Sequence, residues 1–174
     1  MLSELVYTVF DTETTGLNPS QGDEIIQIGA VRVVNQRLLV QESMDQLIDP
    51  KRNIPAHTIP IHGITPEMVR GKPTIEQALP TFHAFSHDTV LVAHNAAFDS
   101  RFWDAELARI GRRRCQEFAC SMLVARRVFP QAPSHKLGVL VDFARLPVAG
   151  RYHRALADAE MAASLLLRLE DELR

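Results

Sequence analysis

The chain has 174 residues, which is enough for one domain with a sizeable apolar core. Its composition, 46% hydrophobic and 23% charged, is typical of a globular protein, and its net charge of −2 gives no general reason to bind a polyanion. No secretory signal or membrane-spanning apolar run is visible, so we expect a cytoplasmic protein with no membrane contact. Cys115 and Cys120 are expected to be reduced thiols, since two thiols alone make a poor zinc site.

The first third of the chain predicts an antiparallel meander. Residues 5–10 are apolar and rich in β-branched and aromatic side chains, which is typical of a buried strand. A second strand is predicted over 24–34, followed by a tight turn at Asn35-Gln36 and a return strand over 37–48. Residues 49–66 contain four prolines and predict an irregular loop, of a length that is often functional.

The rest of the chain alternates predicted helices and strands. Thr65, Thr74 and Ser134 are each expected to cap a helix, over residues up to 70, 75–86 and 135–144 respectively. Short strands are predicted at 89–93 and 117–120. The remaining helices are predicted at 96–110, after residue 120 through 129, and at 154–173. Strands that alternate with helices after an antiparallel hairpin fit an α/β fold, a central mixed β-sheet flanked by α-helices.

A pair of carboxylates stands at the end of the first predicted strand. Asp11 and Glu13 are two residues apart, so they project from the same face of an extended chain. Two acids at the end of a buried strand repel each other and lose hydration, and a hard divalent cation such as Mg²⁺ or Mn²⁺ relieves both penalties. An acidic loop that merely ends a strand is an equally good interpretation of this pair alone.

Two further acids fall on apolar helical stripes. Asp99 shares its face of the predicted 96–110 helix with Trp, Leu and Ile, and Asp158 shares its face of the last helix with Met, Ala and Leu. His153 immediately precedes that last helix. Burying these acids without compensation costs several kcal/mol apiece, on the order expected for isolated buried charges. Their convergence on one or two cations removes that difficulty.

These positions lie within stretches that resemble a known family. FDTETTG at 10–16, HNAAFD at 94–99 and HRALAD at 153–158 resemble the motifs of the DEDDh (DnaQ-like) 3′–5′ exonucleases, most of all the epsilon-type proofreading subunit of bacterial DNA polymerase III. The likeness extends through EIIQIGAV at 24–31 and IHGIT at 61–65. It implies a ribonuclease H-like α/β fold and a single exonuclease domain over 1–174.

The resemblance also implies roles for individual residues. Asp11, Glu13, Asp99 and Asp158 would hold two Mg²⁺ or Mn²⁺ ions, and His153 would be the general base. The terminal nucleotide would be bound by Thr12, Thr14, Thr15, His62 and His57. Epsilon-type chains carry a glutamate near the position of His57, so this residue departs from the pattern. The chain ends directly after the last helix, so no tail for docking a polymerase or a sliding clamp is visible.

The expected activity is hydrolysis of nucleotides from the 3′ end of single-stranded DNA, which releases nucleoside monophosphates. An exoribonuclease acting on short RNA or RNA 3′ ends is the alternative, because the same motifs serve both. A non-catalytic nucleic-acid-binding module is a third, and it would not need a general base. The arginines at 109, 112–114 and 126–127 fit either phosphate contacts or solvated helix ends. Arg151 and Arg154 adjoin His153 and are better candidates for touching the strand.

Overall fold

The computed structural model describes residues 5–148, 150 and 154–174. In this part of the chain the strands form a five-stranded sheet in the order β3-β2-β1-β4-β5. β1 pairs antiparallel with β2 and parallel with β4, β2 pairs antiparallel with β3, and β4 pairs parallel with β5. The predicted mixed sheet is therefore confirmed. The strands are β1 (Val6–Thr14), β2 (Ile25–Val34), β3 (Arg37–Leu47), β4 (Val90–Ala93) and β5 (Phe118–Cys120).

The first strand is longer than the sequence pattern predicted. β1 continues past the apolar run to Thr14, with Asp11 paired with Gly29 and Glu13 paired with Gln27 on β2. The two acids thus lie near the end of a strand that is still paired, and this pairing holds their backbone in place. The predicted turn between β2 and β3 is confirmed, because Asn35 and Gln36 have φ values of 50° and 63°, as a tight hairpin turn requires.

The helices begin largely where capping residues predicted. Thr65 Oγ1 accepts a hydrogen bond from Met68 N, and Thr74 Oγ1 accepts one from Gln77 N. The described helices are α1 (Ile59–His62), α2 (Pro66–Val69), α3 (Ile75–Ser86), α4 (Ala96–Arg109), α5 (Ser121–Val128), α6 (Leu137–Phe143) and α7 (Ala155–Glu172), with 3₁₀ turns at Pro19–Gln21 and Ala56–Thr58. None of the helices in these ranges is both long and apolar enough to span a bilayer.

Two local predictions were wrong. The 49–66 stretch is not wholly irregular, because the Ala56–Thr58 turn runs directly into α1, which ends where Gly63 adopts φ 72°. Ser134 does not cap the following helix. Its hydroxyl accepts a hydrogen bond from Lys136 N at 3.2 Å, and α6 begins only at Leu137. A serine side chain that bonds two residues ahead forms a local turn in competition with a helix start.

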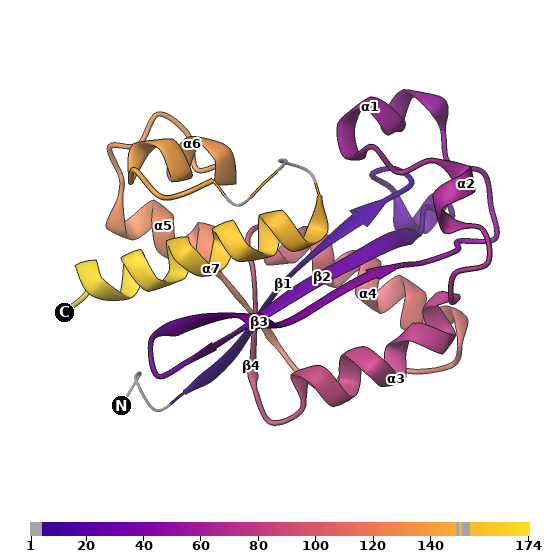
Figure 1. Ribbon diagram of the computed structural model, residues 1–174, viewed down its shortest axis with the longest axis horizontal. Helices are drawn as coiled ribbons and strands as arrows, with labels where there is room; N and C mark the ends of the chain where they lie inside the picture. Colours follow the sequence, from indigo (N-terminus) through magenta and orange to yellow (C-terminus); the bar gives the residue numbers. More distant parts are fainter. Residues whose placement is uncertain (1–4, 149, 151–153) are drawn as a thin grey trace.

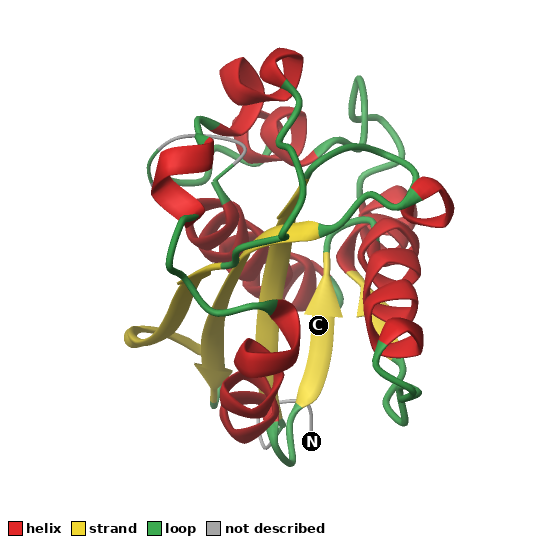
Figure 2. Cartoon of the chain, turned by 90° about the vertical axis from the view of Figure 1, so that its right-hand side faces the viewer, coloured by secondary structure: helices red, strands yellow, loops and turns green. Residues whose placement is uncertain are grey.

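Helices cover both faces of the sheet. α7 lies along one face, and α3 and α4 lie on the other (Figure 1). In the perpendicular view of Figure 2 the strands again run between flanking helices. Side chains alternate along β1, so Val9 packs with α7 whereas Phe10 packs with Phe82 and Trp103 of the α3–α4 layer. Asp11 and Glu13 lie two and four residues after Val9, so their side chains project from the same face of the strand and face α7.

The first turn of α7 approaches the sheet very closely. A Cβ atom on Gly29 would lie only 2.1 Å from the backbone nitrogen of Leu156. The helix face toward the sheet is built from small residues, which shortens the distance between the two layers; they are Ala155, Ala159, Ala162 and Ala163, each at most 2% exposed. Because Gly29 is the partner of Asp11, this contact occurs beside the acid pair of β1.

Candidate active site

Three of the predicted acids form one cluster between β1 and α7. Asp158 lies in the first turn of α7, directly above the face from which Asp11 and Glu13 project. Each of the three offers a carboxylate oxygen, and these oxygens all lie within 4.8 Å of one another. Glu13 and Asp158 are 9% and 8% exposed. The side-chain alternation of β1 and the close approach of α7 together produce this cluster.

Asp99 joins the cluster from the other side of β1. It lies in the first turn of α4 and is 2% exposed. Thr12 projects from the opposite face of β1 to Asp11, and its Oγ1 donates a 2.7 Å hydrogen bond to Asp99 Oδ1. Asp99 lies outside the tight group of three, yet its charge acts on both Asp11 and Glu13. All four predicted acids are therefore brought to one place.

A backbone turn in an uncommon conformation positions Asp99. Asn95 adopts φ 64° and ψ 57°, in the left-handed region that Asn tolerates better than most residues. This turn connects β4 to α4, so the first turn of the helix stands at the carboxyl ends of β1 and β4. The neighbouring His94 is held within the fold, since its Nδ1 lies 2.9 Å from Ser121 Oγ and its Nε2 lies 2.8 Å from the His135 carbonyl oxygen.

The acids strongly disfavour one another's ionisation. Burial, followed by the charges of Asp99, Glu13 and Asp158, raises the pKa of Asp11 well above its usual range. Burial, followed by the charges of Asp158 and Asp99, raises the pKa of Glu13 to about 9, although Arg154 opposes this shift. Burial raises the pKa of Asp99 to about 7, against the hydrogen bond from Thr12. An all-oxygen donor set that repels itself in this way fits a hard divalent cation, which these residues are able to hold.

A cavity of about 720 Å³ opens beside the acids. Besides the four acids, the segment 14–18 and the 55–62 segment line it. Its apolar surface includes Leu17 and Ile61, which are 70% and 52% exposed, and the half-buried ring of Phe98. Phe102 and Trp103 are buried in the core, whereas the half-buried Phe98 packs against that core and also lines the cavity. The position of Phe98, one residue before Asp99 in the first turn of α4, was the sequence signal for its place in the cavity wall.

The predicted substrate-binding threonines use their hydroxyl groups inside the protein. Thr12 donates to Asp99, Thr14 donates to the Gly16 carbonyl oxygen at 2.7 Å, and Thr15 donates to Asp23 Oδ1 at 3.0 Å. All three line the cavity. Thr15 is committed furthest, because its Oγ1 also accepts a hydrogen bond from Glu24 N at 3.0 Å and its own N donates to the Glu24 carbonyl oxygen at 2.9 Å.

The two predicted histidines differ in their surroundings. His62 is 2% exposed, its Nδ1 accepts a hydrogen bond from Ile64 N at 3.0 Å, and its Nε2 lies 3.2 Å from Thr58 Oγ1. A ring nitrogen that accepts from a backbone N–H is unprotonated, so the proton of the neutral ring is on Nε2. His57 is exposed on the same cavity wall. His153 and Arg151 lie outside the described residues, whereas Arg154 stands just before α7.

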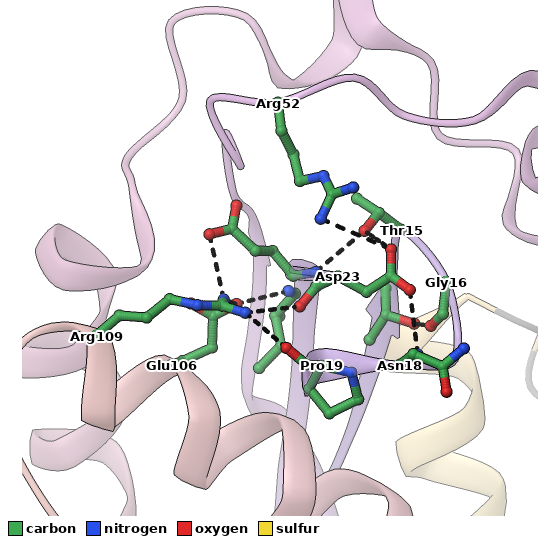
Figure 3. A network of polar contacts seen from close by, with 11 residues as sticks. Thr15, Gly16, Asn18, Pro19, Asp23, Arg52, Glu106 and Arg109 are labelled. Carbon is green, nitrogen blue, oxygen red and sulfur yellow. Dashed lines mark hydrogen bonds and ion pairs between the residues drawn. The ribbon is translucent and has the colours of Figure 1, made fainter. Parts of the chain in front are cut away.

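A polar network that the sequence analysis missed holds the loop after β1 (Figure 3). The Asp23 carboxylate accepts hydrogen bonds from Thr15 Oγ1 at 3.0 Å and from Asn18 N at 3.1 Å. Gly16 permits this arrangement, since a Cβ there would lie 2.3 Å from Asp23 Oδ2. Arg52 approaches the same carboxylate at 3.8 Å. The loop that forms one wall of the cavity is thus fixed by its own acid.

α4 anchors the other end of this loop. Arg109 donates to the carbonyl oxygens of Pro19 at 3.0 Å and Asp23 at 3.3 Å, and to Glu24 Oε1 at 3.2 Å. Glu106, 1% exposed, accepts from Ile25 N at 2.9 Å and pairs with Arg109 at 3.3 Å. Glu106 lies two turns after Asp99 on the same helix face, and that spacing was the sequence signal for it. The same helix thereby positions both an acid of the cluster and the loop beside it.

Comparison with known proteins agrees with this geometry. The family model described as Exonuclease (RNase_T) matches residues 8–166. A DNA polymerase III subunit epsilon-like protein of Rhodobacter capsulatus is 42% identical over 99% of this chain, and the DNA polymerase III subunit epsilon of Rickettsia prowazekii is 34% identical over 97%. The chain spans 25% of the first relative's length and 75% of the second's.

Solved structures are similar as well. Exonuclease X in complex with 5′ overhanging duplex DNA has a TM-score of 0.76 and 32% identity, with 95% of this chain and 91% of that chain covered. The nuclease domain of 3′hExo, a DEDDh family member bound to rAMP, has a TM-score of 0.83 over 95% of this chain and 92% of that chain; at 18% identity it supports the fold alone. The chain therefore belongs to the RNase_T exonuclease family, and the predicted DEDDh-type likeness and ribonuclease H-like fold are confirmed.

Proposed function

We propose that this chain is a metal-dependent exonuclease domain that hydrolyses single-stranded DNA from its 3′ end and releases nucleoside monophosphates. The convergence of four acids, from β1, α4 and α7, on the wall of one large cavity carries this proposal. Relatives named as epsilon subunits of a DNA polymerase support DNA as the substrate class. We regard residues 1–174 as one exonuclease domain.

Asp11, Glu13 and Asp158 would hold divalent cations, with Asp99 completing the set. We propose Mg²⁺ or Mn²⁺, two ions per site, because carboxylate oxygens are the ligands that these cations prefer. When bound, such ions supply Lewis-acid chemistry that lowers the pKa of water and stabilises charge on the leaving oxygen. The role of Thr12 is to orient Asp99, since its hydroxyl fixes one of the two carboxylate oxygens.

His153 is proposed as the general base. It precedes Arg154 and the first turn of α7, which carries Asp158. An imidazole has an unperturbed pKa of about 6.5, so it takes a proton from water near neutral pH and returns it to solvent. General bases contribute roughly 10²–10⁴-fold to rate.

The cavity walls favour an unpaired terminal nucleotide. Leu17, Ile61 and Phe98 offer apolar surface for the face of a base, and stacking of this kind tolerates any sequence. Opening a duplex end costs on the order of 1–2 kcal/mol per base step. We therefore expect single strands and frayed ends to be digested faster than blunt duplex, with a shallow salt dependence because few phosphates meet cationic side chains.

The test is a time course on 5′-labelled strands with either Mg²⁺ or EDTA. The substrates are single-stranded DNA, single-stranded RNA, blunt duplex and a strand with a 3′-phosphate. We expect a ladder that shortens from the 3′ end of DNA only with metal, and a rate lowered roughly 10²–10⁴-fold by His153→Ala. Asp99→Asn should abolish turnover, while Asp142→Asn, the same change at an exposed carboxylate of α6, should leave it unchanged.

Several outcomes would contradict this assignment. Faster digestion of RNA than of DNA would assign the domain to RNA 3′ ends. Internal cuts in a circular single strand would rule out an exonuclease. Binding without hydrolysis under all metal conditions would point to a non-catalytic module.

A further inference from the structure

A second cavity, of about 310 Å³, lies between α3, α4 and the segment that follows α4. Its floor is apolar and is formed by Leu79, Phe82, Leu91, Trp103 and Leu107, each at most 7% exposed. Among the residues that the structure describes, none lines both this cavity and the one beside the acids. We call it the α3–α4 pocket.

The rim of the pocket stands at the opposite end of α4 from the acid cluster. Asp99 lies in the first turn of α4, whereas the rim of the pocket is formed by residues 112–116, just beyond the last turn. A helix of 14 residues is about 21 Å long at 1.5 Å per residue. The rim is therefore roughly one helix length from the acids, although Trp103 of the floor lies only one turn after Asp99.

The rim carries three consecutive arginines. Arg114 is neutralised, because it forms a two-point contact with Asp104 at 2.9 and 3.2 Å and lies 3.6 Å from Glu117. Arg112 and Arg113 are exposed, and among the described residues they make no ion pair. Two uncompensated cations thus stand beside an apolar floor.

We propose that the α3–α4 pocket docks an acidic segment of a partner polypeptide that carries one aromatic or large aliphatic anchor residue. The anchor fills the apolar floor, and the flanking carboxylates pair with Arg112 and Arg113. Protein interfaces commonly combine an apolar centre with a polar rim in this way. A nucleic-acid base on this floor would bury the polar atoms of its edge, which costs free energy unless they are paired, whereas a phenyl or aliphatic anchor buries none. This proposal is independent of the nuclease chemistry.

Trp103 provides a direct readout, because it is the only tryptophan in the chain and forms part of the floor. The experiment titrates the whole chain with a synthetic peptide that has a central phenylalanine flanked by aspartates. We expect a saturable change in tryptophan emission. The same peptide with serine at the centre, or with lysines in place of aspartates, should bind at least about tenfold more weakly.

A pair of double variants separates specific docking from general charge attraction. Arg112→Glu with Arg113→Glu should weaken peptide binding at least about tenfold. Arg126→Glu with Arg127→Glu makes the same charge change on α5, away from the pocket floor, and should leave the affinity within about twofold. In the Arg112→Glu, Arg113→Glu double variant, nuclease activity on a short DNA strand and the melting temperature should be unchanged, because these two arginines are exposed and lie outside the acid cluster.

Other results would overturn the proposal. These are an absence of saturable change, an equal loss of affinity in both double variants, or undiminished binding of the serine peptide. A response to a single-stranded oligonucleotide, but not to the acidic peptide, would make the rim a nucleic-acid surface instead. A concentration-dependent change in emission without peptide would mean that a second copy of the chain fills the pocket.

Discussion

Replacement of Gly29 by alanine tests how the acid cluster is assembled. Gly29 lies on β2 opposite Asp11, and a Cβ there would approach Leu156 N to 2.1 Å and the Ala155 carbonyl carbon to 2.2 Å. Ordinary contacts begin at about 3.4 Å, so the first turn of α7 must retreat by 3.4 − 2.1 = 1.3 Å. Because these atoms belong to the backbone, no side-chain rotation relieves the clash.

This retreat should affect stability moderately and turnover severely. Overpacking costs about 1–3 kcal/mol, which for a chain of this size lowers the melting temperature by roughly 2–12 °C. Asp158 moves with the first turn of α7, and a displacement of about 1 Å at a reacting centre costs about 10²-fold in rate. We therefore expect Gly29→Ala to remain folded but to lose about two orders of magnitude in kcat.

The assay measures kcat on a single-stranded DNA oligonucleotide together with thermal melting. Gly71→Ala is the matched control, because Gly71 has φ +77° and nothing within 4 Å of the new Cβ. It should lose about 1–2 kcal/mol of stability through its backbone conformation, with kcat unchanged. Wild-type turnover in Gly29→Ala would refute the idea that the close approach of α7 to β2 sets the position of Asp158.

Three further outcomes are expected. Thr12→Val removes the hydrogen bond to Asp99 that lowers the pKa of this acid. Because a hydrogen bond to a charged group contributes about 1.5–3 kcal/mol, half-maximal activity should need about tenfold more Mg²⁺. An unchanged metal requirement would contradict this. The pKa of Glu13 is raised to about 9 in the folded chain, so between about pH 4.5 and 9 the folded state binds a proton that the unfolded state has lost. The free energy of unfolding of the metal-free chain should therefore fall as pH rises through this range. Melting in EDTA at several pH values should show this fall, and Mg²⁺ or Glu13→Gln should reduce it. Arg109→Ala should raise KM more than it lowers kcat, because it releases the loop wall of the cavity at Pro19 and not the acids; an equal effect on both constants would argue against this role.

Local sequence determined most of the elements. The period of apolar residues, the left-handed turn at Asn35 and Gln36, and the caps at Thr65 and Thr74 each depend on residues within a few positions of one another. The candidate acids could also be found from sequence, because an acidic residue is unexpected at a position of a helix face that is otherwise apolar. Ser134 shows the limit of this reasoning, since the same side chain satisfies either a helix start or a local turn.

Only the tertiary structure decided how distant groups are used. The sequence predicts the four acids but not how they meet. The packing of α7 against Gly29 brings three of them together on one face of β1. The hydrogen bond from Thr12 joins Asp99 to them from the other face. The tertiary structure likewise engages the threonine hydroxyls in internal hydrogen bonds, pairs Glu106 with the residues after the β1 loop, and exposes Phe98 to the cavity. These contacts join segments more than eighty residues apart in several cases, and no local pattern encodes a distance that depends on how two layers pack.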